Sequence, residues 1–283
     1  MKALCEIFLT LPILLLLCSC SGENVLNAFV PKTGYEVHKG IAYGTDPRQK
    51  MDIYVPDNLQ KPVCTVLFFY GGRWTTGDRG LYRFTGEALS SKGCVTAIAD
   101  YRVYPKIRYP AFLEDSAQAF VYLHRHAPEY GGDPKRLFLA GHSAGAYDAV
   151  MIAVHPRFIK EAGGQPSWIK GVIGISGPYD FLPFTDKDVI DIFSTEKDAA
   201  TQPINYVRAG LPPMLLVHGE NDTEVLPKNT RNMAAKLREF NNPVTVHIYP
   251  EAQHQAIVLS LLHGFRGKTP LLRDIATFIK EHP

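Results

Sequence analysis

The stretch that decides the fold is Arg-Leu-Phe-Leu-Ala-Gly-His-Ser-Ala-Gly, residues 136–145. Residues 136–141 form an apolar run that predicts a buried strand, and a helical pattern over residues 144–155 follows at once. Between them lies G-x-S-x-G, which in a strand, turn and helix setting exposes a serine hydroxyl on a tight turn. Small neighbours are needed there because the backbone is crowded. Ser143 is therefore the candidate nucleophile, in preference to a purely structural glycine turn.

Apolar, β-branched runs alternate with helical patterns along the rest of the chain. The predicted strands are residues 35–43, 51–55, 63–70, 95–99, 136–141, 169–175, 214–218 and 244–249, and the predicted helices are 81–92, 112–126, 144–155, 228–240 and 271–280. From the third strand onward the runs are continuous, as a sheet covered on both faces requires. This order predicts an α/β fold with a mostly parallel eight-stranded sheet and helices on both faces.

Residues 178–208 interrupt the alternation of predicted strands and helices. The segment mixes aromatic, aliphatic and charged side chains. The segment is too long for a plain connection, so it predicts a short lid insertion, with an ordinary surface excursion that contains one core helix as the alternative.

Composition excludes one large class of function. The 283 residues carry 30 Lys or Arg and 28 Asp or Glu, a formal charge of +2. An electrostatic nucleic-acid binder needs clustered cations, so we expect no nucleic-acid partner. With 46% hydrophobic residues, the chain has the composition of a globular protein. We assign residues 35–283 to one catalytic domain.

The start of the chain resembles a bacterial lipoprotein signal. An apolar run over residues 7–17 follows Lys2 and ends in Leu-Cys-Ser-Cys, residues 17–20. The run is too short to span a bilayer, which takes about 18–20 residues, but fits the core of a secretory signal. The pattern predicts a signal peptide over residues 1–19, a lipid-bearing Cys20 as mature N-terminus and a spacer over 20–34. We expect secretion across the inner membrane to the periplasm or cell envelope, with a lipid anchor making the membrane a partner. The oligomeric state is left open.

Cys64 and Cys94 are the cysteines that remain beyond this leader. Two thiols do not make a disulfide scaffold, and each lies at the start of a predicted strand. Buried free thiols are the simpler interpretation, and a bridge between the two stays open.

A serine nucleophile needs a base, and the base needs an acid that fixes its tautomer. In this kind of sheet the chain order is serine, acid, histidine. After the strand at 214–218 comes Gly-Glu-Asn-Asp-Thr-Glu, from which we choose Asp222, with Glu220 and Glu224 as rivals. His254 follows the last strand by a short loop and is the expected base, because candidates such as His247 lie within a predicted strand or helix.

The strand at 63–70 ends in Gly-Gly-Arg-Trp, residues 71–74, whose glycine backbone can present N–H groups to a ligand. Together with the N–H of Ala144, this loop can form an oxyanion hole. A phosphate loop is the alternative, because residues 72–77 have G-x-x-x-x-G spacing. Asp78 stands where that motif requires lysine, which disfavours phosphate.

Over roughly residues 35–280 the chain resembles an α/β-hydrolase of the hormone-sensitive-lipase-like branch, close to bacterial carboxylesterases and to feruloyl-esterase or arylformamidase relatives. The matching features are residues 70–74, Asp100-Tyr101-Arg102, residues 109–112 with Glu114-Asp115, GHSAG, His218-Gly219 with Asp222, and His254.

The resemblance implies hydrolysis of a small-molecule carboxylic ester through an acyl-enzyme, with no cofactor and no metal. It implies that the N–H groups of Gly72 and Arg73 bind the oxyanion, and that Asp100, Arg102 and Asp115 are structural.

Three further residues near this predicted site carry expectations of their own. Tyr70 departs from the histidine usual in the resembling family, a residue that orients the glycine loop, and its hydroxyl can substitute at longer reach. Trp74 suits an apolar or aromatic substrate group, with core packing as the alternative. Asp148 is expected to be a hydrogen-bonded helix position.

Two other functions stay open. One is amide or formamide hydrolysis by the same triad, as in arylformamidases. The other is a non-catalytic hydrolase fold kept for binding, which the presence of all three triad residues disfavours.

Overall fold

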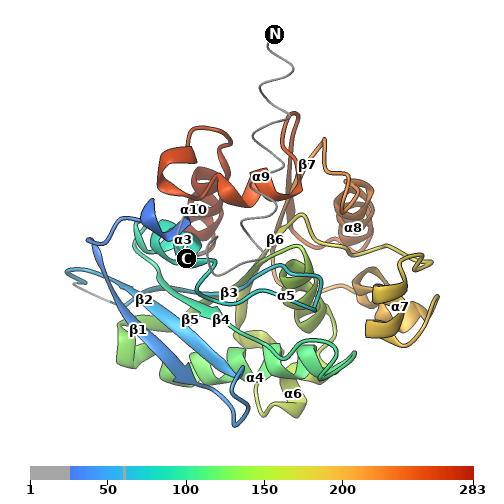
Figure 1. The fold of residues 1–283 in the computed structure, drawn as a ribbon, viewed down its shortest axis with the longest axis horizontal. Helices are drawn as coiled ribbons and strands as arrows, with labels where there is room; N and C mark the ends of the chain where they lie inside the picture. Colours follow the sequence, from blue (N-terminus) through green and yellow to red (C-terminus); the bar gives the residue numbers. More distant parts are fainter. Residues whose placement is uncertain (1–25, 60–61) are drawn as a thin grey trace.

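One eight-stranded sheet organises residues 26–59 and 62–283, the part of the chain that the computed structural model describes (Figure 1). The sheet order is β1-β2-β4-β3-β5-β6-β7-β8. The strands are β1 (Tyr35–Ala42), β2 (Lys50–Pro56), β3 (Val63–Phe69), β4 (Val95–Ala99), β5 (Gly132–His142), β6 (Ile169–Ile175), β7 (Met214–Gly219) and β8 (Val244–Tyr249). β2 pairs antiparallel with β1 and β4, and all other neighbours are parallel. The predicted mostly parallel, eight-stranded sheet is confirmed.

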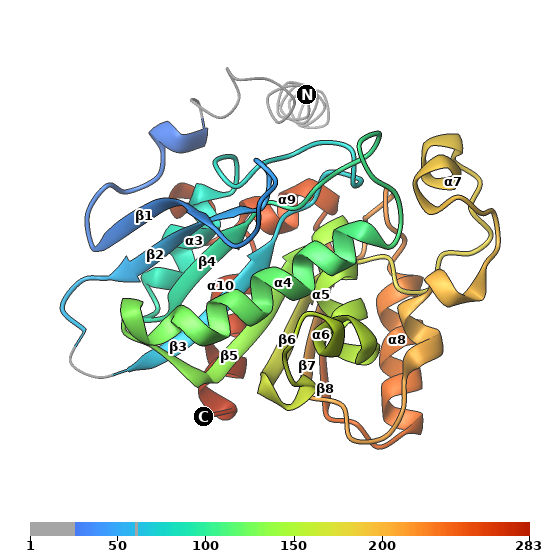
Figure 2. The same ribbon diagram turned by 90° about the horizontal axis from the view of Figure 1, so that it is seen from below.

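Helices cover both faces of this sheet, as predicted. Figure 2 shows α4 (Ala111–His126) and α5 (Ala144–Val154) in front of the sheet and α3 (Arg83–Ser90) and α10 (Leu271–Glu281) behind it. A further helix, α8 (Lys228–Glu239), packs against β7 and β8. The core therefore consists of two apolar layers, one on each side of the strands.

Burial of the strands follows their place in the sheet. Nearly every side chain of β3, β4, β6 and β7 is buried, which explains their continuous apolar sequences. The expectation that β8 is buried along its whole length is wrong. This strand lies at the edge of the sheet, and most of its side chains are only half-buried.

Among the described residues, the helices whose bounds the sequence does not predict include α6 (Arg157–Glu161), α7 (Lys187–Phe193) and α9 (His254–Leu259). Each has at most seven residues, too few to establish a helical period. The insertion at 178–208 contains α7 and two short 3-10 turns, and α7 lies at the periphery of the molecule (Figure 1).

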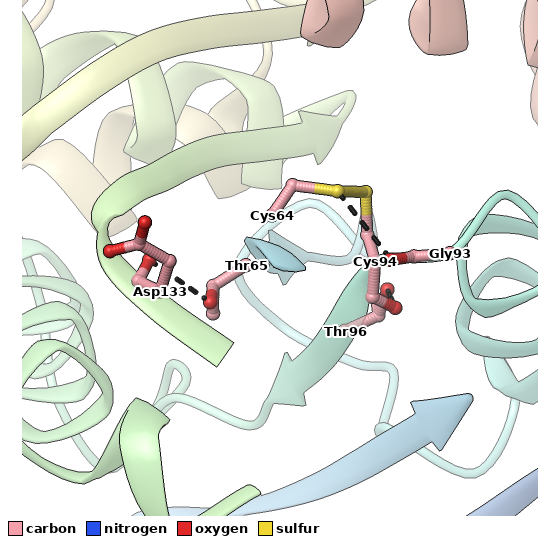
Figure 3. The surroundings of a disulfide bond; sticks show 6 residues. All are labelled: Cys64, Thr65, Gly93, Cys94, Thr96 and Asp133. Carbon is pink, nitrogen blue, oxygen red and sulfur yellow. Dashed lines mark hydrogen bonds between the residues drawn. A yellow bond between two sulfur atoms is a disulfide. The ribbon is translucent and has the colours of Figure 1, made fainter. Parts of the chain in front are cut away.

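A disulfide joins Cys64 and Cys94, so the interpretation as free thiols is wrong (Figure 3). Cys64 lies in β3 and Cys94 directly precedes β4, and these two strands are parallel neighbours with Thr65 opposite Val95. This pairing brings the two Cα atoms to 4.7 Å. The sequence does not reveal the contact because it depends on the lateral order of the strands.

Among the described residues, no helix combines the length and apolar character needed to cross a bilayer. The predicted signal peptide, Cys20 and the first part of the spacer lie outside these residues.

Candidate active site

Ser143 occupies a sharp turn between β5 and α5. Its φ of 55° is in the left-handed region, which non-glycine residues seldom adopt. Glycines are required on both sides: a Cβ on Gly141 would lie 2.2 Å from the carbonyl oxygen of Gly145, and one on Gly145 would lie 2.1 Å from that of Phe69. This crowding explains the G-x-S-x-G spacing. The sharp turn presents the serine hydroxyl at the carboxyl edge of the sheet.

The structure brings Ser143, His254 and Asp222 together. Oγ of Ser143 is 2.8 Å from Nε2 of His254, and Nδ1 of His254 is 2.7 Å from Oδ2 of Asp222. Their exposed fractions are 8%, 4% and 2%, respectively. The three residues follow β5, β8 and β7, so the carboxyl ends of three parallel strands converge on one site. His254 is the first residue of α9 rather than part of a free loop, which fixes its backbone.

Asp222 is held as an anion. Its Oδ1 accepts hydrogen bonds from the backbone N–H groups of Glu224 and Val225, at 3.0 and 2.9 Å. Nε2 of His218 lies 3.2 Å from Oδ2. Burial by itself raises the pKa of Asp222, but the bonds from His218 and His254 outweigh it and hold the pKa well below its usual range. A stable carboxylate beside Nδ1 keeps the His254 proton on that nitrogen and leaves Nε2 free to accept one.

The two rival carboxylates lie elsewhere. Glu220 forms an exposed ion pair with Arg231. Glu224 places Oε2 at 4.0 Å from Nε2 of His254, but its side chain is 45% exposed and lies on the serine side of the imidazole. Neither occupies the position of Asp222.

The loop at residues 71–74 borders the nucleophile. A Cβ on Gly71 would lie 2.9 Å from Cβ of Ser143, so Gly71 packs directly against the nucleophile. Arg73 and Trp74 both have positive φ, at 55° and 57°. Ala144 is the first residue of α5, where backbone N–H groups have no partner within the helix. Gly71 and Ala144 thus lie directly beside Ser143, and the assignment of Gly72, Arg73 and Ala144 as oxyanion donors stays a prediction.

Tyr70 does not hold the glycine loop through a direct hydroxyl contact. Its hydroxyl donates to Oδ1 of Asp100 at 2.9 Å and accepts from Nη2 of Arg48 at 2.8 Å. Nη2 of Arg48 also donates to the carbonyl of Gly77 at 2.7 Å. Through Arg48, the tyrosine is therefore linked to Gly77, three residues beyond the loop. Asp100 also pairs with Arg79, in keeping with a structural role.

Trp74 does not line an open site, which corrects its prediction as a substrate contact. The side chain is 3% exposed, and its ring packs between Phe112, Tyr147 and Phe193 at centroid distances of 5.0–5.6 Å. Its indole nitrogen donates to Oδ1 of Asp148 at 3.0 Å. The tryptophan is buried in the core because its ring packs on other aromatic rings and its indole N–H has a buried acceptor in Asp148.

The insertion at 178–208 contacts this loop from outside. The guanidinium of Arg73 pairs with Asp186, the residue that caps α7, and Phe193 of α7 packs on Trp74. Arg73 thus points its side chain toward solvent and the insertion, so only its backbone can face the nucleophile.

Three residues at the site have roles that the sequence did not reveal, although His218-Gly219 is among the features of the family resemblance. His218 supports Asp222, and His142 and Tyr82 form hydrogen bonds around the loop and the base. His142 was visible inside the motif as its first variable position. Nothing in the sequence marks Tyr82, which lies 60 residues earlier.

Among residues 26–59 and 62–283, no three metal-binding side chains gather into a possible metal site. The described site consists instead of a serine, a histidine and an aspartate, with backbone amides beside them.

A doubly covered parallel sheet with a serine elbow after β5, an acid after β7 and a histidine after β8 defines the α/β-hydrolase class. Within this class, the family model described as BD-FAE matches residues 51–237, well over half of the chain. The chain belongs to the BD-FAE family.

Individual relatives are more distant. The chain is 29% identical over 268 residues to a probable isoprenylcysteine alpha-carbonyl methylesterase of Arabidopsis thaliana, covering 86% of this chain and 56% of that protein. It is 25% identical to a kynurenine formamidase of Salmo salar, with 89% of each chain covered. Among solved structures, an inhibited esterase B from Lactobacillus rhamnosis matches 92% of this chain and 91% of its own with a TM-score of 0.79 at 20% identity. That likeness shows the fold.

Proposed function

We propose that this protein is a serine carboxylesterase that hydrolyses small carboxylic esters through an acyl-enzyme. The observation that carries the proposal is the continuous chain of hydrogen bonds from Asp222 through His254 to Ser143. Ester hydrolysis is also the activity named for the plant relative, of whose length this chain spans 56%.

The proposed reaction begins when Nε2 of His254 takes the proton of Ser143 while Oγ attacks the ester carbonyl carbon. The backbone N–H groups of Gly72, Arg73 and Ala144 stabilise the oxyanion that forms, each contributing about 2.7–4 kcal/mol. As the intermediate collapses, the carbon–oxygen bond breaks, His254 returns its proton to the leaving alkoxide, and the acyl group stays on Ser143. Water then attacks the acyl-enzyme, with His254 as base, and the carboxylic acid leaves.

Turnover of a short p-nitrophenyl ester tests the proposal. Ser143→Ala should lower kcat to the background rate without unfolding the protein. Ser91→Ala is a matched control, because this serine lies at the end of α3, where its hydroxyl donates to the Ala88 carbonyl at 2.6 Å. Retained hydrolysis in Ser143→Ala would refute the assignment. Absence of labelling of the folded wild type by a fluorophosphonate would instead favour a non-catalytic binding protein.

Formamide hydrolysis is the second candidate, because the kynurenine formamidase match covers 89% of both chains. The same triad can cleave an N-formyl aryl amide. A comparison of kcat/KM for N-formyl aryl amides and aryl esters decides between them, with a higher value for the amide favouring the formamidase.

We also propose secretion and lipid attachment at Cys20. The leader sequence supports both. The exposed Phe29 and Phe265 line an apolar hollow of about 650 Å³ together with Leu26, six residues after Cys20, on a side that an anchor would hold near a bilayer. Metabolic labelling with palmitate should mark the wild type and not Cys20→Ser. Equal labelling of both would contradict the anchor.

A further inference from the structure

A buried row of hydrogen bonds runs from the glycine loop to the backbone of the base. The N–H of Gly71 donates to the hydroxyl of Tyr82 at 3.2 Å, and that hydroxyl lies 3.0 Å from Nδ1 of His142. On the other side of the ring, Nε2 of His142 lies 3.1 Å from the carbonyl oxygen of His254. All four residues are buried, so solvent does not replace these bonds.

Elementary donor and acceptor rules fix the direction of this row. A carbonyl oxygen only accepts, so Nε2 of His142 must carry the proton that reaches His254. Burial, followed by repulsion from His254, lowers the pKa of His142 to about 3 and keeps the ring neutral, so Nδ1 is an acceptor. Tyr82 then donates to Nδ1 and uses a lone pair to accept the Gly71 N–H. Every N–H or O–H proton in the row then has one acceptor.

The geometry points to His142 and Tyr82 as positioning residues that fix the oxyanion loop and the catalytic base relative to each other. We call the row from Gly71 through Tyr82 and His142 to His254 the relay. Its first end is the N–H of Gly71, the residue directly before the proposed oxyanion donor Gly72. The other end is the main chain of the residue whose imidazole takes the serine proton. This inference rests on the proposed serine-hydrolase mechanism.

Neutrality of His142 is part of the same role. Its ring centroid lies 4.9 Å from that of His254, and the other ionisable groups that act on it are Asp222 and His218. His254 becomes positively charged in the transition state, so a second charge at this distance would oppose its formation. Because Nε2 is committed to a carbonyl and Nδ1 to a hydroxyl donor, the relay holds the uncharged tautomer.

The first experiment compares His142→Leu with His142→Gln. Leucine removes both polar contacts, whereas the glutamine amide offers one acceptor for Tyr82 and one N–H donor for the His254 carbonyl. We expect kcat for a p-nitrophenyl ester to fall about 10- to 100-fold in His142→Leu and to recover to within about fivefold of the wild type in His142→Gln. KM should change less than threefold, because the His142 side chain is fully buried and offers substrate no surface.

A second set of variants tests whether the residues act as one unit. Tyr82→Phe should lower kcat as His142→Leu does, and the double variant should lose no more than the worse single variant. Tyr249→Phe is the matched control, since its buried hydroxyl donates to Asp274 at 2.8 Å outside the relay. It should lose stability but keep kcat.

Three outcomes would overturn the relay: wild-type kcat in folded Tyr82→Phe and His142→Leu, no recovery in His142→Gln, or an equal kcat loss in Tyr249→Phe. If the variants do not fold, nitrogen NMR of the wild-type imidazoles still tests the relay. The relay requires His142 to be neutral, with its proton on Nε2, between pH 5 and 8. An imidazolium or an Nδ1 proton would contradict it. Turnover by Ser143→Ala would instead refute the underlying mechanism, so the two failures are distinguishable.

Discussion

The indole nitrogen of Trp74 donates a 3.0 Å hydrogen bond to Oδ1 of Asp148, and both side chains are buried. Asp148 lies in the first turns of α5, the helix that begins directly after Ser143, and Trp74 ends the glycine loop. The bond therefore joins the nucleophile's helix to the loop of proposed oxyanion donors. It confirms that Asp148 is a hydrogen-bonded helix position, and it identifies the partner in the loop, which the sequence does not show.

Asp148 should behave as a neutral carboxylic acid. Burial raises its pKa well above the usual range, so the folded protein keeps the proton at pH 7, whereas the unfolded chain ionises above about pH 3.9. Stability that depends on Asp148 therefore falls as pH rises above about 4. Asp148→Asn does not titrate, and its amide oxygen can still accept the Trp74 N–H. We therefore compare the free energies of unfolding of the variant and the wild type. The variant should gain stability relative to the wild type when the pH is raised from 4 to 7.

Asp148→Leu is the comparison for this prediction. It leaves the buried Trp74 N–H unpaired and should cost about 1–3 kcal/mol of unfolding free energy at either pH. Urea unfolding of the three proteins at pH 4 and 7 measures both effects. An asparagine variant whose stability relative to the wild type is the same at pH 4 and pH 7 would show that folding does not raise the pKa of Asp148.

Asp222→Asn should lower kcat on the order of 10³- to 10⁴-fold, because an amide N–H facing Nδ1 favours the wrong tautomer of His254. His218→Gln should lower it less, since Asp222 retains two backbone N–H donors. Steady-state kinetics on a p-nitrophenyl ester measure both. A loss below tenfold in Asp222→Asn, with the protein folded, would remove Asp222 from the mechanism.

Local sequence carries enough information for the strands and for the three residues that meet at the site. An apolar run predicts a buried strand because both faces of the inner sheet are covered, and chain order restricts the acid and the base to the ends of later strands. Since parallel strands end at one edge, Ser143, Asp222 and His254 converge although 111 positions separate the first from the last.

Contacts between side chains of neighbouring elements were not predictable in this way. The disulfide depends on β3 and β4 lying side by side, and Tyr82 reaches His142 only after α3 has packed on the sheet. Trp74 follows the glycine loop in sequence, but its direction depends on the cluster with Phe112 and Phe193. The spacing of residues along the chain therefore predicts neither the disulfide, nor the contact of Tyr82 with His142, nor the direction of Trp74.

Gly72→Ala should abolish most activity. An added Cβ would lie 2.2 Å from the carbonyl oxygen of Thr76, at a φ of 149°, so the loop that carries the proposed oxyanion donors must move. Gly93→Ala is the matched control, with a φ of 86° and open space around its Cβ. Both variants should lose about 1 kcal/mol or more of stability, but only Gly72→Ala should lose 10²- to 10³-fold in kcat. Equal activity in the two would argue against the loop's role.

Removal of the disulfide should destabilise the protein without changing the site. The bridge closes a loop of 30 residues, for which chain entropy gives roughly 3.5 kcal/mol. The double variant Cys64→Ala/Cys94→Ala should lower the unfolding free energy by about that amount in urea, while kcat at 25 °C stays within about twofold. Unfolding curves of oxidised and reduced wild type that coincide would show that the bond does not form in solution.

His142 should make the folded state sensitive to mild acid. Below about pH 6.5 the unfolded chain binds a proton at this histidine, whereas the folded protein resists protonation until about pH 3 because the ring is buried beside His254. The unfolded state thus holds more protons across this window, and stability falls as pH falls, by up to about 1.4 kcal/mol per pH unit.

His142→Gln should flatten the dependence of unfolding free energy on pH between 4.5 and 6.5. His124→Gln should flatten it less, because His124 is only partly buried, although burial lowers its pKa too. Parallel curves for wild type and His142→Gln would mean that His142 is protonated in the folded protein, and a charged ring could not accept the Tyr82 hydroxyl proton.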